Sequence, residues 1–188
     1  MLFRSLSAQN PNNALLNEHV FPAPVLARYV MIRALNNWGG SCCIGIQQIR
    51  VLTAADTLSG RNLSLSETGA TIHSFSGQYA TSYPASTLID AASNNSYWAS
   101  PNGTTASWIK IDLAGERPRQ IDLVQLTGAG GAERVKDFQL LVSETGTTDA
   151  DFTLVQEGTA PNSDVPMDIF LENPQTARYL MQIGRAHV

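Results

Sequence analysis

Alternation of apolar and polar residues with a period of two is the main pattern along this chain. Between Trp108 and Leu113, the odd-numbered positions hold Ile, Ile and Leu, whereas the even-numbered positions hold Trp, Lys and Asp. A strand with this pattern buries one face. The same reasoning predicts strands at Thr71–Phe75, Ile121–Thr127, Asp137–Ser143, Phe152–Gln156, Val165–Leu171 and Ala177–Ile183. Two of their expected core faces consist of Phe138, Leu140 and Val142, and of Val165, Met167, Ile169 and Leu171.

The N-terminal part contains two further predicted strands, Ala27–Arg33 and Ile44–Leu52, joined by a loop rich in Asn and Gly. The apolar positions of the second strand change parity in its middle, which predicts a β-bulge at Gln47 and Gln48. The residues on the two sides of this change are Ile44 and Ile46, then Ile49 and Val51. Short strands separated by turn residues, with only a helical turn or two at Pro84–Ala92, predict an all-β sandwich or jelly roll.

One short sequence occurs twice. The residues from Ala177 to Met181 read Ala-Arg-Tyr-Leu-Met and repeat the Ala-Arg-Tyr-Val-Met from Ala27 to Met31, at an offset of 150 residues. Pro24 and Pro174, and Asn12 and Asn162, match at the same offset. Tandem copies of one module are the simplest explanation.

Charge is distributed unevenly and narrows the range of partners. The whole chain has a net charge of −4, but the stretch from Asn62 to Ile183 carries six basic and fourteen acidic residues. A surface with this excess of carboxylates lacks the cations that neutralise phosphates, so nucleic acid and anionic lipid are poor partners. No apolar run approaches the ~18 residues that a membrane-spanning helix requires.

No catalytic motif is present in the sequence. The three histidines are far apart, and no nucleophile elbow, zinc-protease or phosphate-loop pattern occurs. The two cysteines, Cys42 and Cys43, are adjacent, so a disulfide between them would be strained. We expect one buried thiol and one partly exposed thiol, and no zinc site, because no Cys-x-x-Cys and no nearby His accompanies them.

The central stretch resembles a known family. Asp90 lies in a polar turn that leads to Trp98-Ala99-Ser100, and a second tryptophan begins the sequence Trp-Ile-x-x-Asp-Leu at Trp108. This order of residues resembles the discoidin family, the F5/8 type C or galactose-binding-like modules, which include the family 32 carbohydrate-binding modules. The resemblance implies a jelly-roll β-sandwich in which both tryptophans pack between the sheets. It also implies non-catalytic carbohydrate binding, as an accessory or adhesion module of a larger secreted or surface protein.

The resemblance and the repeat together suggest a domain organisation. Residues 1–52 are expected to be the C-terminal remnant of a preceding module, residues 53–61 a linker, and residues 62–183 a module lacking its closing strand. Residues 184–188 resemble a translated sequencing-adapter read-through and are expected to be a scar. The nine-residue linker reaches at most about 30 Å. We therefore predict that Ile44–Leu52 folds back as the closing strand; the rival outcome is a small separate sheet.

Many modules of this kind hold a structural calcium ion beneath the Asp turn. The matching positions here are Asp90, Asn94 and Ser96, which offer the oxygen ligands that Ca²⁺ requires. Three departures oppose a metal: Ala91 replaces the family's Gly, the spacing to Trp98 is longer, and the acidic residue of the closing strand corresponds to Gln48. The alternative is an Asx-turn in which Asp90 caps its own backbone.

A sugar site in such modules lies on loops at one rim of the sandwich. An aromatic ring stacks there on the apolar face of the pyranose, and polar groups bind its hydroxyls. The candidate residues are His73, Gln78, Tyr79, Tyr83, Asn102 and Arg134. Each could instead be an ordinary surface side chain, and Arg134 could pair with Asp137. Trp38, in its Asn/Gly loop, is a further possible stacking surface.

Three functional interpretations follow from the sequence. The first is binding of a glycan or polysaccharide outside the cell. The second is a structural spacer or protein-interaction module without a sugar site. The third, calcium-assisted binding of phospholipid, is disfavoured by the acidic charge and by the lack of an evident apolar spike loop.

Overall fold

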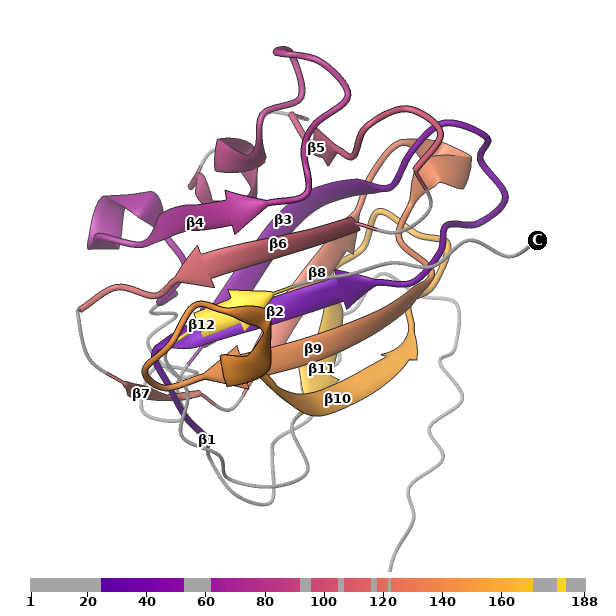
Figure 1. Ribbon diagram of the computed structural model, residues 1–188. Coiled ribbons are helices and arrows are strands. Elements are labelled where there is room, and N and C mark those ends of the chain that lie inside the picture. Colours follow the sequence, from indigo (N-terminus) through magenta and orange to yellow (C-terminus); the bar gives the residue numbers. More distant parts are fainter. Residues whose placement is uncertain are drawn as a thin grey trace, which may run out of the picture.

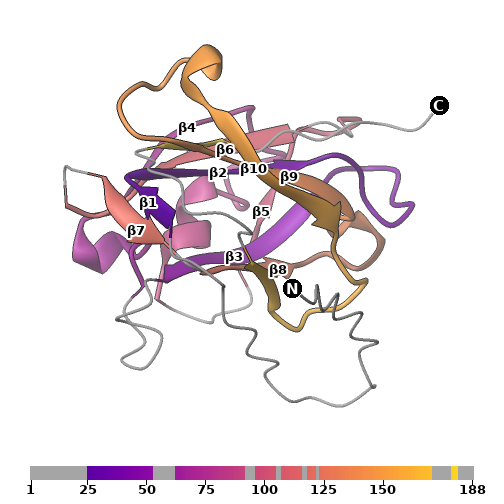
Figure 2. The same cartoon turned by 90° about the horizontal axis from the view of Figure 1, so that it is seen from below.

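The computed structural model describes residues 25–52, 62–91, 96–104, 107–115, 118–121, 123–170 and 179–181. These residues form two antiparallel sheets that face each other, as Figures 1 and 2 show from two directions. The predicted all-β jelly-roll sandwich is therefore confirmed. The expected linker at 53–61 and the segment 184–188 lie outside the described residues. Among the described residues, no helix has the length and apolar character needed to cross a membrane.

In the larger sheet, β10 pairs with β9 at one end and β4 pairs with β6 at the other. The position between β9 and β6 is assigned to both β2 and β12. Its strands are β2 (Tyr29–Ala34), β4 (Thr71–Phe75), β6 (Ser107–Asp112), β9 (Asp137–Ser143), β10 (Thr153–Thr159) and β12 (Tyr179–Met181). Both β2 and β12 are paired with β6 and with β9.

The smaller sheet has the order β11-β8-β3-β5. Its strands are β3 (Gly45–Leu52), β5 (Trp98–Ala99), β8 (Leu123–Gly128) and β11 (Met167–Phe170). A separate two-stranded ladder joins β1 (Val25–Ala27) to β7 (Arg119–Ile121). Single turns of 3-10 helix connect the strands: η1 (Ser66–Thr68), η2 (Ala85–Ile89), η3 (Gly131–Glu133) and η4 (Asp149–Asp151).

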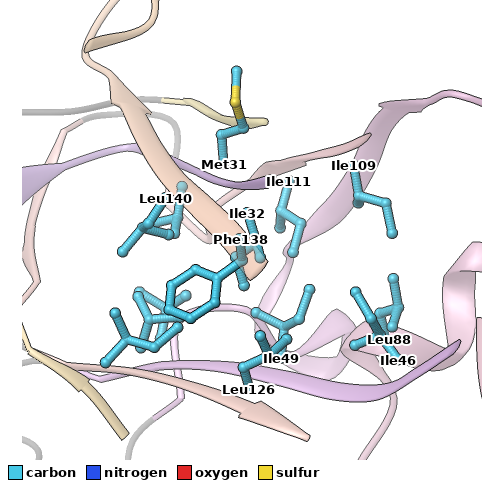
Figure 3. Close-up of a cluster of buried hydrophobic side chains, with 14 of the residues drawn as sticks. Met31, Ile32, Ile46, Ile49, Leu88, Ile109, Ile111, Leu126, Phe138 and Leu140 are labelled. Atoms are coloured by element: carbon cyan, nitrogen blue, oxygen red, sulfur yellow. The ribbon is translucent and has the colours of Figure 1, made fainter. Parts of the chain in front are cut away.

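The alternation read from the sequence fills the space between the sheets. Ile109, Ile111 and Leu113 are at most 1 % exposed, and the predicted face of β9 is buried as well. Figure 3 shows side chains from β6 and β9 directed toward those of β3, β8 and η2. Burial of each such Ile or Leu side chain contributes roughly 1.5–3 kcal/mol. The core therefore holds the two sheets together and fixes the positions of the loops at their ends.

The prediction that Ile44–Leu52 joins the second half of the chain is confirmed. β3 pairs with β8 from Ile46↔Gly128 to Leu52↔Leu123, and its register shifts between Ile46 and Gln48, where the bulge was expected. Ile44, Ile46, Ile49 and Val51 are all fully buried. The chain re-enters the sandwich beside β3, because the side-chain oxygen of Asn62 accepts hydrogen bonds from the backbone N–H groups of Val51 and Ser64, each at 3.0 Å.

Two details of the predicted core are wrong. Trp108 does not pack between the sheets: it is half-buried, on the face of β6 opposite Ile109. There its ring lies 5.1 Å from the ammonium group of Lys110, which also donates to Asp149 Oδ1 at 2.7 Å. Val165 is 52 % exposed, because β11 begins only at Met167 and the residues before it form a bend.

Candidate functional site

Four loops meet at one rim of the sandwich. They are the connections β2–β3, β4–η2, β5–β6 and β8–β9. Backbone hydrogen bonds tie them together: Gly40 N donates to Ala132 O at 3.0 Å, and Gly103 N donates to Cys42 O at 2.7 Å. Figure 1 shows the β2–β3 and β8–β9 loops side by side at the right of the molecule. This rim is where the sugar site is expected.

A cluster of three tyrosines lies on the rim. The ring of Tyr79 meets that of Tyr83 edge to face, with centroids 5.7 Å apart, and the ring of Tyr83 is tilted against that of Tyr97 at 5.0 Å. Tyr79 is 48 % exposed, whereas Tyr83 and Tyr97 are half-buried. Such edge and tilted contacts are the geometries that aromatic pairs prefer, so the two inner rings support the outer one. We call Tyr79, Tyr83 and Tyr97 the tyrosine cluster.

Tyr97 anchors this cluster to the β8–β9 loop. A Cβ atom added to Gly45 would overlap the carbonyl of Ala129, and one added to Gly130, which has a φ of +87°, would lie 3.6 Å from the Tyr97 ring. Gly45 therefore allows β3 to approach the Ala129 carbonyl, and Gly130 supplies the left-handed turn of the β8–β9 loop beside the ring. Burial, followed by a hydrogen bond with Tyr83, raises the pKa of Tyr97 to about 12. The phenol is consequently neutral over the physiological range and can act as a hydrogen-bond donor.

Tyr97 was missed from the sequence, although a signal for it was present. Trp98 was predicted to face the core, and successive residues of a strand point to opposite sides. Trp98 is fully buried, with its indole N–H donating to Gly77 O at 3.0 Å. The side chain of its neighbour Tyr97 had to point away from the core, toward the rim.

The polar candidate residues near the tyrosine cluster differ in whether their side chains are already hydrogen-bonded within the protein. The side-chain amide of Gln78 donates to Ala80 O, within its own loop, at 3.2 Å. Tyr79 N donates to Ala99 O at 2.8 Å, which holds this loop against β5. Asn102 is exposed at the turn that contacts Cys42 through Gly103. Asn102 is therefore the more accessible of the two amides.

Trp38 lies on the same rim and is 36 % exposed. The ammonium group of Lys136 lies 5.4 Å from the centre of its ring. The side chain of Asn37 keeps the loop in place, because its amide donates to Gly40 O and Cys43 O, each at 2.9 Å. The rim thus presents a second aromatic surface, contributed by the N-terminal part of the chain.

Arg134 lies beside the rim but is occupied within the protein. Its guanidinium binds Asp164 Oδ1 at 2.5 Å through Nη2 and at 2.8 Å through Nε, and also donates to Asn162 Oδ1 at 2.9 Å. The alternative pairing with Asp137 is therefore wrong; that carboxylate instead accepts from the hydroxyl of Thr159 at 2.6 Å. Arg134 joins the β8–β9 loop to the segment before β11.

His73 lies within a strand and not in a rim loop. It is exposed at the point where the register between β4 and β6 shifts, and its Nδ1 lies 3.0 Å from the Ser74 hydroxyl. A bulge lets two successive residues of one strand face the same partner residue. The contacts described above do not bring His73 into the tyrosine cluster.

The calcium prediction falls only partly on described residues, since Asn94 lies outside them. Asp90 ends η2, and its backbone carbonyl accepts a hydrogen bond from Gln48 Nε2 at 3.0 Å. The other end of the same amide, Gln48 Oε1, accepts from Arg50 Nε at 3.0 Å. A hydrogen-bond donor and a guanidinium therefore occupy the side from which the family's acidic residue would approach. Among the described residues, no group of three or more His, Cys, Asp or Glu side chains could hold a metal ion.

The two cysteines match their predicted environments. Both are free thiols, and Cys43 is buried whereas Cys42 is half-exposed. Burial is the main cause that raises the pKa of the Cys43 thiol to about 12, with Cys42 and the charge of Glu133 adding to it. Cys43 therefore remains protonated and unreactive at neutral pH.

Comparison with known proteins assigns a family to most of this fold. The family model described as the F5/8 type C domain matches residues 70–184. No curated protein and no solved structure matches the chain. The matched span includes the tyrosine cluster and the Asp90 turn. β2, β3 and Trp38 lie before it in the sequence, although they belong to the same sandwich.

Proposed function

The chain belongs to the F5/8 type C family, whose members are typically binding modules for glycans or lipids, and from this premise we propose that it binds carbohydrate without catalysis. In this proposal it is an accessory or adhesion module of a larger secreted or surface protein. The ligand is a neutral glycan or polysaccharide, and the site is the tyrosine cluster with the surrounding loops.

The tyrosine cluster is the observation that supports this proposal best. An exposed ring backed by two further rings is held in one orientation, so little conformational entropy is lost when a sugar stacks on it. The C–H face of a pyranose is apolar and meets the negative face of the ring favourably. The phenol hydroxyls and the exposed amide of Asn102 offer donors and acceptors for the hydroxyl groups of a sugar. None of these contacts requires a charged ligand.

The net negative charge of this part of the chain favours a neutral sugar over an anionic membrane as the ligand. The segment from Asn62 to Ile183 has a net charge of −8. At the rim, Arg134 is already paired with Asp164, so its charge is compensated within the protein. An anionic lipid surface attracts clusters of uncompensated basic residues, which this composition does not favour.

A second candidate is a spacer or protein-interaction module without a sugar site. It is favoured by one observation: Gln78 and Arg134, two of the polar candidates, are bound to groups within the protein. In that case the exposed rings of Trp38 and Tyr79 would serve a protein interface, where aromatic residues are enriched.

A glycan array probed with the whole chain distinguishes the two candidates. We expect binding to one class of neutral sugar, lost in Tyr79→Ala and retained in Leu154→Ala. Leu154 is 44 % exposed on β10, outside the rim loops, and is a matched control for the loss of an exposed apolar side chain. Absence of binding across the array, together with tight binding of a partner protein, would select the second candidate.

A further inference from the structure

Glu133, in the β8–β9 loop, lies between the two aromatic surfaces of the rim. On one side, a Cβ atom added to Gly40 would lie 2.9 Å from the carboxyl carbon of Glu133, and Gly40 belongs to the same β2–β3 loop as Trp38. On the other side, a Cβ atom added to Gly130 would lie 3.4 Å from the Cβ of Glu133 and 3.6 Å from the Tyr97 ring. The side chain of Glu133 therefore neighbours both the Trp38 loop and the tyrosine cluster.

The carboxylate of Glu133 keeps its full capacity to accept hydrogen bonds. Within the part of the chain that the structure describes, no hydrogen bond or ion pair engages it. The guanidinium of the adjacent Arg134 binds Asp164 instead. The ammonium group of Lys136 lies over the ring of Trp38. An ionised carboxylate has two acceptor oxygens with about four lone-pair positions, and here they are open to a ligand.

The electrostatic influence of Glu133 extends to both sides of the β8–β9 loop. The pKa values of the Cys43 thiol and the Tyr97 phenol are raised mainly by burial, and the negative charge of Glu133 adds a smaller contribution to each. Cys43 belongs to the β2–β3 loop, whereas Tyr97 belongs to the tyrosine cluster. The charge of Glu133 thus lies close to both loops.

We propose that Glu133 binds two adjacent hydroxyl groups of a neutral oligosaccharide that runs along the rim from the tyrosine cluster to Trp38. This inference rests on the proposed function, and it makes the ligand a chain of sugar units instead of one terminal sugar. Two adjacent hydroxyls present two donors side by side, which match the two oxygens of a carboxylate. Hydrogen bonds to an ionised acceptor are roughly twice as strong as neutral ones. The flanking sugar units stack on Tyr79 and Trp38.

The same carboxylate gives the site a preference among sugars. A sugar chain that carries carboxylates of its own would bring like charges together at Glu133, which disfavours binding. Neutral chains meet no such repulsion. Glu133 therefore selects neutral over acidic sugars in addition to binding hydroxyl groups.

Calorimetric titration with sugars of increasing length tests the Trp38 end of this site. The probes are galactose, glucose, mannose and xylose, each from the single sugar to the linear hexamer, added to the whole chain. We expect oligomers of the recognised sugar to bind roughly three- to tenfold more tightly than the single sugar, because a second stacking contact is gained. Trp38→Ala should abolish this gain without changing the affinity for the single sugar, and Trp38→Phe should keep part of it. Leu154→Ala is the control and should behave like the unmodified chain.

Acidic sugars test the carboxylate itself. Glu133→Gln keeps the shape of the side chain and removes its charge. This variant should bind the neutral oligomer roughly fivefold more weakly, because a charge-assisted hydrogen bond becomes a neutral one. It should bind linear galacturonate oligomers more tightly than the unmodified chain does, because the like charge is gone. A purely structural role of Glu133 would weaken both kinds of binding, so changes of opposite sign identify a binding residue.

The outcomes separate this inference from the proposed function. If Tyr79→Ala loses binding while Trp38→Ala and Glu133→Gln bind every probe normally, the extended site is overturned and the proposed function stands. Weaker binding of both neutral and acidic oligomers by Glu133→Gln would also overturn the role of the carboxylate. Absence of binding of every probe to the unmodified chain would overturn the proposed function, and this inference with it.

Discussion

Tyr97 and Trp98 are neighbours in the chain, yet they belong to two regions of different character. Trp98 lies in the core, fully buried, with its indole N–H bonded to a backbone carbonyl. Tyr97 points to the rim, where it supports Tyr83 and through it the exposed ring of Tyr79. The core aromatic stabilises the fold, whereas the rim aromatics form a surface. Stability and binding should therefore respond to different substitutions, and this separation can be tested.

The largest effect is expected in the core. Trp98→Ala should lower the free energy of unfolding by roughly 3–5 kcal/mol, because it leaves a cavity and an unpaired carbonyl at Gly77. Chemical denaturation followed by circular dichroism measures the change. A loss of less than about 1 kcal/mol would show that the core and the rim do not differ as described.

A smaller loss is expected for Trp108, which the family resemblance placed in the core. Because its ring is half-buried on the outer face, Trp108→Ala should cost roughly 1–3 kcal/mol, partly through the contact with Lys110. Trp108→Phe keeps an aromatic face toward the ammonium group and should recover part of this loss. If Trp108→Ala proved as costly as Trp98→Ala, the outer-face assignment would be wrong.

Alternation along the strands was sufficient to predict most of the sandwich. The strands at Thr71–Phe75 and Asp137–Ser143 have the predicted bounds, and the bulge in β3 lies where the parity of its isoleucines changes. These features depend on local periodicity, which the sequence shows directly. Alternation places Trp108 on the face opposite Ile109, as found; its assignment to the core came from the family resemblance and not from the periodicity.

The site was less predictable than the fold. Tyr79 and Tyr83 are close in sequence and could be grouped, but Tyr97 joins them only through the arrangement of the loops. Arg134 was paired with the nearest carboxylate in the sequence, Asp137, whereas the fold brings Asp164 to it. Contacts between distant loops are set by the tertiary structure, and one sequence does not reveal them.

Alkaline pH should lower the stability of the protein through Cys43 and Tyr97, which lie where the core meets the rim. Folding raises the pKa of Cys43 from 9.0 to about 12 and that of Tyr97 from 10.0 to about 12, mainly because burial disfavours the charged forms. This contribution to stability is fully present below pH 9 and decreases as the pH rises toward 12. A melting-temperature series from pH 7 to 11 should fall above pH 9, and less steeply in Cys43→Ala. Equal slopes for both proteins would contradict the role assigned to Cys43.

The calcium prediction can be tested by measuring melting temperatures in calcium and in chelator. If Asp90 binds calcium, saturating metal raises the melting temperature by mass action, and Asp90→Ala abolishes the gain. Because Gln48 places a donor at the Asp90 carbonyl, we expect only a small gain in the unmodified chain and a larger one in Gln48→Glu. Equal melting temperatures of the unmodified chain and of Gln48→Glu in calcium and in chelator would refute the metal site.

The smallest effect on stability, and the largest on binding, is expected at Tyr79. The decisive measurement is a titration of the sugar identified on the array against the unmodified chain, Tyr79→Ala and Leu154→Ala, at low and at moderate salt. We expect Tyr79→Ala to weaken binding roughly tenfold, consistent with the loss of about 1.4 kcal/mol of stacking, with an unchanged melting temperature. Leu154→Ala should bind normally, and salt should have little effect, because contacts to a neutral sugar are not screened. Equal affinity of Tyr79→Ala and the unmodified chain, or a steep loss of binding with salt, would contradict a neutral-sugar site at the tyrosine cluster.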